Sequence, residues 1–353
     1  MRIFVGILLA CGSYVGIAQD VEERFSAPSP QQLDELDPRY EETLRELVAS
    51  PAGRAFLEAL VLIDREYLYA TDADTLLRGA TAGLIEALDD PYSRYLDPDT
   101  VAALRAGEFD EDAVEKARLG DVGYVRVRSF QHDTVGALVN RALDLHLASG
   151  ARALVLDLRG NQGGPVLQGL QVLDRFLSDG VLGFRRVRGV SVPIAYANPR
   201  ALSEPLAVLV DSGTASTAEI VAGALQAYGR AQVVGSVTAG KGIGQSSLAL
   251  PDGAELHLVS FEWLLPGFRS IDGSGLRPDV EIQPPGSHVT PGLVVRSMQD
   301  VAEDPALGAA LKLLRDAVGD DLAIPSGAPP APATSVGPSM LPPVPDEGNS
   351  QGD

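Results

Sequence analysis

Apolar side chains along this chain follow two different spacings, and the change from one to the other divides the sequence. From about residue 29 to residue 117 they recur every three or four positions, which is the period of an amphipathic helix. Asp72 or Asp74 can cap the clearest of these helices. Its apolar stripe consists of Leu76, Leu77, Ala80, Leu84 and Leu88. The first third of the chain is therefore predicted to be helical.

From about Asp121 the pattern changes to short strands separated by amphipathic helices. Residues 123–130 alternate as a strand, and residues 151–160 form an apolar run that ends in the polar turn GNQGG. Further strands are predicted at 205–211 and 231–235, and helices at 138–149, 166–178 and 217–229. Strands that alternate with helices predict an α/β core with a largely parallel sheet.

The last part of the chain is predicted to hold a β-hairpin, a helix and a flexible tail. Residues 246–266 place two apolar strands around the turn at residues 251–253, and residues 304–319 have helical spacing. Eight prolines fall within the 21 residues from Pro325 to Pro345. Such a composition cannot bury enough apolar surface to order itself.

The first eighteen residues combine one arginine, an apolar run and small residues at Gly16 and Ala18. They predict a secretory signal that is cleaved near Ala18. Residues 8–12 also resemble a bacterial lipoprotein box, in which Cys11 would be lipidated and attach the chain to a membrane. Both alternatives stay open, and both predict export to the periplasm or cell envelope. Cys11 is the only cysteine, so the folded part has no thiol for disulfides, catalysis or metal binding.

These patterns predict four regions with distinct roles. They are a signal peptide at 1–18, a helical region at 19–110, a core at 111–322 and a disordered proline-rich tail at 323–353. The net charge is −20, from 28 basic and 48 acidic residues, and no basic cluster offsets it. Nucleic acid is therefore excluded as a partner, because phosphate binding needs a concentrated basic face.

The stretch from Gly235 to Gln245 fits the Walker A spacing as far as Lys241. The pattern then requires a hydroxyl for magnesium, and this chain has Gly242. A phosphate loop also needs a helix after it, whereas the following residues are β-rich. The sequence therefore argues against a nucleotide site, and we expect neither a cofactor nor a metal.

Ser216 follows a predicted strand and precedes a predicted helix, and two interpretations of it are open. With Glu219 it forms a capping box, which is a structural role. The same position also places its hydroxyl beside free backbone N–H groups at the positive end of a helix, where an oxyanion can be stabilised.

A serine hydroxyl needs a base before it can act as a nucleophile. None of the histidines lies in a glycine-rich turn beside an acid, so a serine–histidine–aspartate triad is poorly supported; they are His132, His146, His257 and His288. A lysine can replace histidine if burial lowers its pKa toward neutrality. Lys241 lies between two glycines, and its sequence neighbours supply no carboxylate, which suits a neutral amine.

Several segments of the sequence resemble the C-terminal processing peptidases, also called tail-specific proteases. Residues 214–231 are similar to the SASASEI motif of the family with its following AGAL and RA, and residues 240–245 are similar to GKGxxQ. Residues 156–164 are similar to LDLRxNxGG, and residues 275–279 to a late G-x-x-PD segment. The likeness covers about residues 55–110 and 121–318.

The resemblance implies a crotonase-like (ClpP/crotonase-type) α/β peptidase core and a serine endopeptidase that cleaves unfolded or C-terminal protein segments without a cofactor. Ser216 would be the nucleophile, Lys241 the general base and Gln245 the residue that orients the lysine. The backbone N–H groups of Gly163 and Thr217 would form the oxyanion hole. Asp157 and Arg159 are expected to hold the end of their strand rather than to take part in chemistry.

Two features depart from the family pattern. Members usually carry a PDZ domain before the core, but only about a dozen residues separate Phe109 from the strand at 123–130, so that domain is expected to be absent. Gln162 stands where the family often has proline. A regulatory partner or a homo-oligomer would then have to replace the missing gate. The alternative function is a non-catalytic peptide-binding or scaffold protein on the same fold. An acyl-CoA enzyme is disfavoured by export.

Overall fold

A computed structural model describes residues 38–105, 113–282 and 304–324. The chain divides into two compact units. The N-terminal unit combines Met1–Arg105 with Ser247–Leu258, and the core unit contains Ala106–Ser246 and Val259–Asp353. The predicted signal, Cys11 and the proline-rich tail lie outside the described residues.

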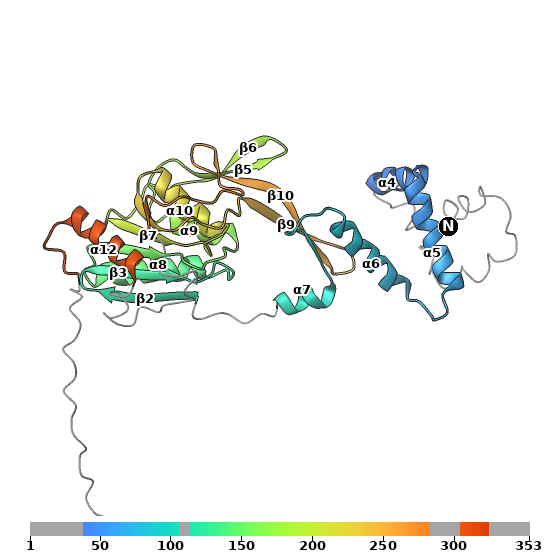
Figure 1. The fold of residues 1–353 in the computed structure, drawn as a ribbon, viewed down its shortest axis with the longest axis horizontal. Helices are drawn as coiled ribbons and strands as arrows, with labels where there is room; N and C mark the ends of the chain where they lie inside the picture. The colour runs from blue at the N-terminus through green and yellow to red at the C-terminus, as the bar shows by residue number, and fades with distance from the viewer. Residues whose placement is uncertain (1–37, 106–112, 283–303, 325–353) are drawn as a thin grey trace, which may run out of the picture. The chain divides into compact units, whose positions relative to one another are not determined.

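The N-terminal unit is mostly helical, as the apolar spacing predicts (Figure 1). Its elements are α4 (Pro38–Ala49), α5 (Pro51–Glu66), α6 (Ala73–Glu86), β1 (Arg94–Leu96) and α7 (Pro98–Arg105). Asp72, not Asp74, caps α6, because its carboxylate accepts a hydrogen bond from Thr75 N at 3.0 Å. The apolar stripe of α6 does not form a core, since no residue of this helix is buried.

The main sheet of the core unit has the order β12-β8-β7-β4-β3-β2. The strands are β2 (Val114–Leu119), β3 (Val122–Val127), β4 (Ala153–Asp157), β7 (Leu206–Val210), β8 (Ala231–Gly235) and β12 (Val280–Glu281). All neighbouring pairs from β3 to β12 are parallel, and only β2 runs antiparallel. The predicted α/β core with a largely parallel sheet is thereby confirmed.

Helices cover both faces of this sheet, which is why β3, β4 and β7 are buried along their whole length (Figure 1). The helices are α8 (Val135–Ala148), α9 (Val166–Leu173), α10 (Thr217–Ala227) and α12 (Pro305–Val318). Val125, Leu156 and Val208 pack in one apolar cluster with α8, α9 and α10. Tyr124 and Val155 point the other way and pack in a second cluster with α12. Successive side chains of each strand point to opposite faces of the sheet and therefore pack in two separate hydrophobic cores.

The predicted helical period up to residue 117 is wrong at its end, because β2 begins at Val114. This strand has the sequence VEKARL, whose charged side chains are tolerated on the outermost strand of the sheet. α7 ends at Arg105, so the interval before β2 is short. The absence of a PDZ domain stays a prediction.

A second, antiparallel set of strands contains β5 (Val181–Val187), β6 (Val190–Tyr196), β9 (Ile243–Ala249), β10 (Glu255–Leu265) and β11 (Arg269–Ser270). The predicted hairpin is confirmed, since β9 pairs with β10 and Leu250 N donates to Ala254 O at 2.8 Å across the turn. The chain passes from the core unit to the N-terminal unit and back within these two strands. In the N-terminal unit, β1 pairs with residues 255–257 of β10.

No helix within residues 38–105, 113–282 and 304–324 is long and apolar enough to span a bilayer.

Candidate active site

Ser216 lies where the loop after β7 turns into α10, and its backbone is strained. Its φ is 55° and its ψ is −120°, a conformation that non-glycine residues rarely adopt. Such a conformation costs about 1–3 kcal/mol and persists only where the surrounding structure holds it. Ser216 and Glu219 form the predicted capping box, in which Glu219 Oε2 accepts from Ser216 N at 2.8 Å.

Glu219 connects Ser216 to the lysine loop. Its side chain is fully buried, and the same Oε2 that accepts from Ser216 N also accepts from Lys241 N at 2.9 Å. Its Oε1 accepts from Gly240 N at 2.8 Å and from Thr238 Oγ1 at 2.5 Å. Both nitrogens therefore lie within 2.9 Å of one oxygen, and they cannot be further apart than about twice that distance. Two segments 25 residues apart in the sequence meet at this carboxylate.

The glycines beside Lys241 are required by packing, not by a phosphate. A Cβ on Gly240 would lie 2.8 Å from Gly275 N, and one on Gly242 would lie 2.5 Å from Asp272 N. The same loop accepts and donates hydrogen bonds, because Gly242 N donates to Asp272 Oδ1 at 3.1 Å and Gly273 N to Gly240 O at 2.9 Å. β9 begins at Ile243, so the helix that a phosphate loop needs is absent from this described segment.

Two acids bind the backbone of the lysine loop, although none of its sequence neighbours is acidic. Glu219 binds the Lys241 N–H, and Asp272 binds the N–H of the next residue. The acids come from α10 and from a loop 30 residues downstream, so the sequence around Lys241 could not show them. The Lys241 side chain is half-buried.

The glycine-rich turn after β4 packs directly against Ser216. A Cβ on Gly163, whose φ is 91°, would lie 2.8 Å from the Ser216 Cβ and 3.0 Å from Thr217 N. The structure thus brings Gly163 and Thr217 together beside the serine, as the resemblance implies. The Gly163 N–H is not vacant, however, because it donates to Asn161 Oδ1 at 2.8 Å. It can donate to an oxyanion only after it leaves Asn161.

Gln245 is the third residue of β9 and is half-buried. It follows Lys241 on the same segment of chain, and its predicted role of orienting the lysine stays a prediction.

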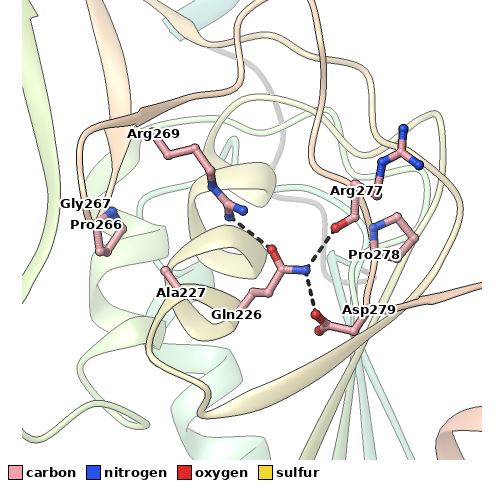
Figure 2. A pocket seen from close by; sticks show the side chains of 8 residues that line it. All are labelled: Gln226, Ala227, Pro266, Gly267, Arg269, Arg277, Pro278 and Asp279. Carbon is pink, nitrogen blue, oxygen red and sulfur yellow. Dashed lines mark hydrogen bonds between the residues drawn. The ribbon is translucent and has the colours of Figure 1, made fainter.

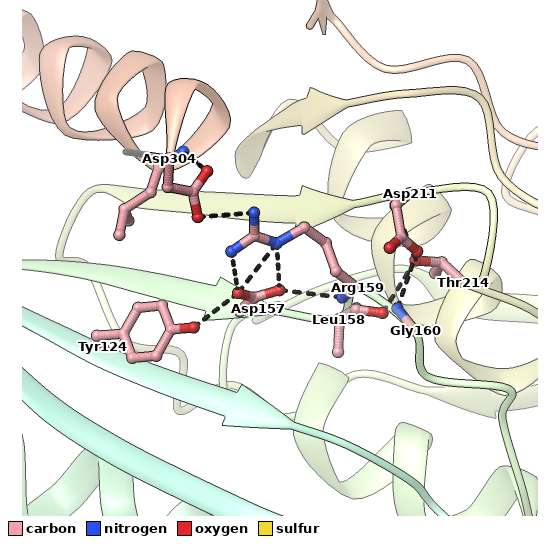
Figure 3. Close-up of polar contacts among 9 residues, drawn as sticks. Tyr124, Asp157, Leu158, Arg159, Gly160, Asp211, Thr214 and Asp304 are labelled. Carbon is pink, nitrogen blue, oxygen red and sulfur yellow. Dashed lines mark hydrogen bonds and ion pairs between the residues drawn. The ribbon is translucent and has the colours of Figure 1, made fainter. Parts of the chain in front are cut away.

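A buried ionic network supports the strand end that precedes the glycine-rich turn (Figure 3). Asp157 is fully buried and accepts from Tyr124 Oη at 2.7 Å and from Arg159 Nη2 at 2.6 Å. Arg159 Nη1 also lies 2.8 Å from Asp304 Oδ2, and Asp304 caps α12 through Leu307 N at 3.0 Å. Asp157 and Arg159 therefore hold the strand end, as predicted, and also fasten α12 to the sheet.

The network changes the pKa values of its members. Burial alone would raise the pKa of Asp157, but the charge of Arg159 and the hydrogen bonds from Arg159 and Tyr124 outweigh it. The pKa of Asp157 consequently lies below its ordinary value. Burial and the Asp157 charge raise the pKa of Tyr124, which stays a neutral donor.

Asp211 ties the serine loop to the glycine-rich turn. Its Oδ1 accepts from Gly160 N at 2.8 Å and from Gly213 N at 3.0 Å. Thr214 Oγ1 donates to Leu158 O at 2.9 Å and, with the bond from Gly160 N, crosses between the loops (Figure 3). Ala215 N donates to Asn161 O at 2.8 Å on the other side of this junction.

Each histidine of the described segments pairs with a residue other than Ser216. His146 is buried, and its Nε2 pairs with Tyr124 O at 3.1 Å; burial lowers its pKa. His132 pairs with Thr134, and His257 with Glu255. His288 lies outside the described residues. Among the described residues, no group of three histidine, cysteine, aspartate or glutamate side chains could hold a metal.

A cavity of about 620 Å³ is lined by Gln226 and Ala227 (Figure 2), which are the last two residues of α10, whereas Ser216 precedes its first residue. Its walls include Gln226, which accepts from Arg269 Nη2 at 3.0 Å and donates to Asp279 Oδ1 at 3.1 Å. α10 has 11 residues, so the two places are separated by roughly 16 Å along the helix axis. The cavity is not part of the serine site.

The fold and the site define an arrangement: an α/β core in which one buried glutamate oxygen binds the backbone N–H of a serine at a strained strand–helix turn and that of a glycine-flanked lysine. Residues 121–282 match the model of "Peptidase family S41". Residues 7–100 match that of "Activating protease CtpB N-terminal domain". Residues 121–282 are thus similar to peptidase family S41, and residues 7–100 are similar to the CtpB N-terminal domain.

Two curated relatives are similar to about half of this chain. A "Probable CtpA-like serine protease" of Staphylococcus aureus (strain bovine RF122 / ET3-1) is 34% identical over 177 residues, which are 49% of this chain and 36% of that protein. The Staphylococcus epidermidis protein of the same name is 33% identical over 177 residues, with the same coverage of both chains. The match thus spans little more than a third of these relatives.

Two solved structures have a similar fold. The photosystem II D1 C-terminal processing protease matches with a TM-score of 0.56 and 20% identity, over 71% of this chain and 97% of its own. A lipoprotein from Streptococcus agalactiae matches with a TM-score of 0.50 and 17% identity, over 60% of this chain and 79% of its own. At these identities the likeness concerns the fold alone.

Proposed function

We propose that this protein is a serine endopeptidase that works through Ser216 and Lys241. The observation that carries the proposal is the shared oxygen of Glu219, which accepts hydrogen bonds from the backbone nitrogens of both residues. The similarity of residues 121–282 to peptidase family S41 supports the same conclusion. A capping serine alone would not need a strained backbone, nor a lysine loop fastened beside it.

The reaction would proceed through an acyl-enzyme. The neutral amine of Lys241 takes the proton of Ser216 Oγ while Oγ bonds to the scissile carbonyl carbon. The tetrahedral intermediate then breaks its C–N bond, and the leaving amine takes the proton back from Lys241. Water, deprotonated by Lys241, hydrolyses the ester and restores Ser216. Gln245 would orient the lysine during both steps.

The developing oxyanion would be held by the N–H groups of Thr217 and Gly163. Thr217 is the first residue of α10, so its N–H has no acceptor within the helix. Gly163 would exchange Asn161 Oδ1 for the oxyanion during the reaction. Each such donor typically contributes about a hundredfold or more in rate.

The substrates would be unfolded or C-terminal protein segments outside the cytoplasm. The signal-like first eighteen residues support export, and Cys11 leaves lipid attachment as the alternative to cleavage near Ala18. Without a PDZ domain, capture of C-termini and control of the dyad would fall to other surfaces, to a regulatory partner or to a second copy.

Incubation of the purified protein with casein, beside Ser216→Ala and Lys241→Ala variants, tests the proposal. We expect cleavage by the wild type only, and labelling of the wild type only by a serine-reactive fluorophosphonate. Equal cleavage by all three proteins would refute the dyad. A wild type that binds unfolded peptides but is never labelled would instead support the scaffold alternative.

A further inference from the structure

Glu219 makes more hydrogen bonds than a helix cap requires. A capping-box glutamate needs to accept only from the backbone of its own cap residue. Glu219 does this through Ser216 N, but it also accepts from Thr238, Gly240 and Lys241, which belong to another segment of the chain. One carboxylate thus receives three N–H groups and one hydroxyl, two on each oxygen.

We propose that Glu219 is the positioning residue that sets the spacing between Ser216 and Lys241. The inference rests on the proposed peptidase function and assigns that spacing to one side chain. Glu219 is the third residue of α10 and is completely buried, so its carboxylate is fixed by the helix. Ser216 and Lys241 then take their places from the same oxygen, Oε2.

The second oxygen extends this control to a third loop. Thr238 Oγ1 donates to Glu219 Oε1 and accepts from Leu276 N at 2.7 Å. Thr238 N donates in turn to Leu276 O at 3.2 Å. The loop that packs on Gly240 and Gly242 is thus connected to the same carboxylate. A change at Glu219 would move the lysine relative to the serine, without removing either residue.

The chemistry of the site makes glutamine a poor replacement. All four partners are placed as donors, and a carboxylate offers two acceptor oxygens with room for them. A glutamine side chain keeps one oxygen and turns an NH₂ group toward two of these donors. At least one buried backbone N–H group is then unsatisfied and repelled, because only the Thr238 hydroxyl could turn to accept from the NH₂ group. An alanine variant also loses the bonds, but it places no NH₂ group against the donors.

The test compares Glu219→Gln with wild type in fluorophosphonate labelling and in peptide hydrolysis across pH. A displacement of about 1 Å in a reacting group costs about a hundredfold in rate, so we expect the labelling rate and kcat of Glu219→Gln to fall by about that factor. KM should stay within about threefold, because the residue does not touch substrate. The pH profile of labelling should also shift, since the lysine is displaced. A purely structural role would leave kcat and the pH profile of the folded fraction unchanged.

Thr238→Val provides a second variant in case Glu219→Gln does not fold. It removes one of the four donors while leaving the carboxylate and both dyad residues in place, and we expect a smaller fall in kcat, about threefold to tenfold, again with KM unchanged. Asp279→Asn is the matched control, because its carboxylate also accepts from a backbone N–H, Val233 N at 2.8 Å, but at the far end of α10. It should keep wild-type kcat.

The outcomes separate the two proposals. A wild type that is neither labelled nor active would overturn the proposed function itself. A labelled and active wild type, together with folded Glu219→Gln and Thr238→Val variants that match it in kcat and pH profile, would overturn the positioning role and leave the dyad intact.

Discussion

Replacing Gly163 with alanine tests whether the glycine-rich turn must touch the serine. The new Cβ would lie 2.8 Å from the Ser216 Cβ, 2.9 Å from Ala215 O and 3.0 Å from Thr217 N. Carbon atoms normally approach no closer than about 3.5 Å, so the turn and the serine loop would have to separate by several tenths of an ångström or more. The φ of 91° adds a second cost, about 1–2 kcal/mol for any residue with a Cβ.

Gly189→Ala separates the two costs. Gly189 has a φ of 85°, close to that of Gly163, but a Cβ there would have no atom within 4 Å. Both variants should therefore lose about 1–2 kcal/mol of unfolding free energy from backbone strain, with an additional loss in Gly163→Ala. Only Gly163→Ala should lose activity, by about a hundredfold in kcat, because a small misplacement of reacting groups has that effect.

The assay combines urea unfolding of both variants with kcat and KM on a fluorogenic peptide or labelled casein. The argument fails if Gly163→Ala and Gly189→Ala show the same kcat. It also fails if Gly163→Ala is inactive only in proportion to its unfolded fraction.

Two further predictions concern the core unit. Asp157→Asn removes the charge that Arg159 faces in a buried pair, so it should lower the unfolding free energy, measured by urea unfolding, by about 3–5 kcal/mol. The control Arg45→Ala breaks an exposed pair and should lower the unfolding free energy by less than about 1 kcal/mol. Equal losses in the two variants would contradict the argument. Because the folded pKa of Asp157 is lowered, its contribution is complete above its unfolded pKa of about 3.9 and is lost as pH falls through the folded value. Burial lowers the pKa of His146, so the unfolded chain binds a proton that the folded chain does not, and stability should fall as pH drops below about 6.5. His146→Gln should show a shallower fall in urea midpoint between pH 7.5 and pH 5, and an unchanged slope would exclude this cause.

The strands that could be predicted from the sequence are those that are buried along nearly their whole length. Residues 206–210 and 231–235 are short apolar runs between polar turns, and every residue of these strands except Gln232 is buried, so the local pattern and the tertiary environment agree. The β5–β6 hairpin was not predicted. Its two-residue turn places Arg188 and Gly189 at φ values of 47° and 85°, and an arginine at such a turn gives little signal. Pro193 further weakens the appearance of a strand in β6.

The site was predictable only as far as local motifs reach. Ser216, Lys241, Gly163 and Thr217 stand out by their positions beside glycines and at a helix start. Gly163 packs against Ser216 and Thr217, and Glu219 binds the backbone of Lys241. Glu219 was assigned to the capping box, because one local bond explains it adequately. Its other three bonds reach residues 19 to 22 positions away, and no sequence spacing encodes them. The Asn161 bond to Gly163 likewise depends on the φ of Gly163.

The hairpin of β9 and β10 has a consequence for how this protein could be cut or recombined. Its base begins two residues after Lys241, whereas its tip, Ser247–Leu258, belongs with the N-terminal unit, where β1 pairs with it and Arg78 bonds to Asp252 at 3.2 Å. Deletion of residues 1–105 would therefore remove the residues that pair with the tip of the hairpin. Any exchange of the first hundred residues between homologues would have to carry this distant insert along.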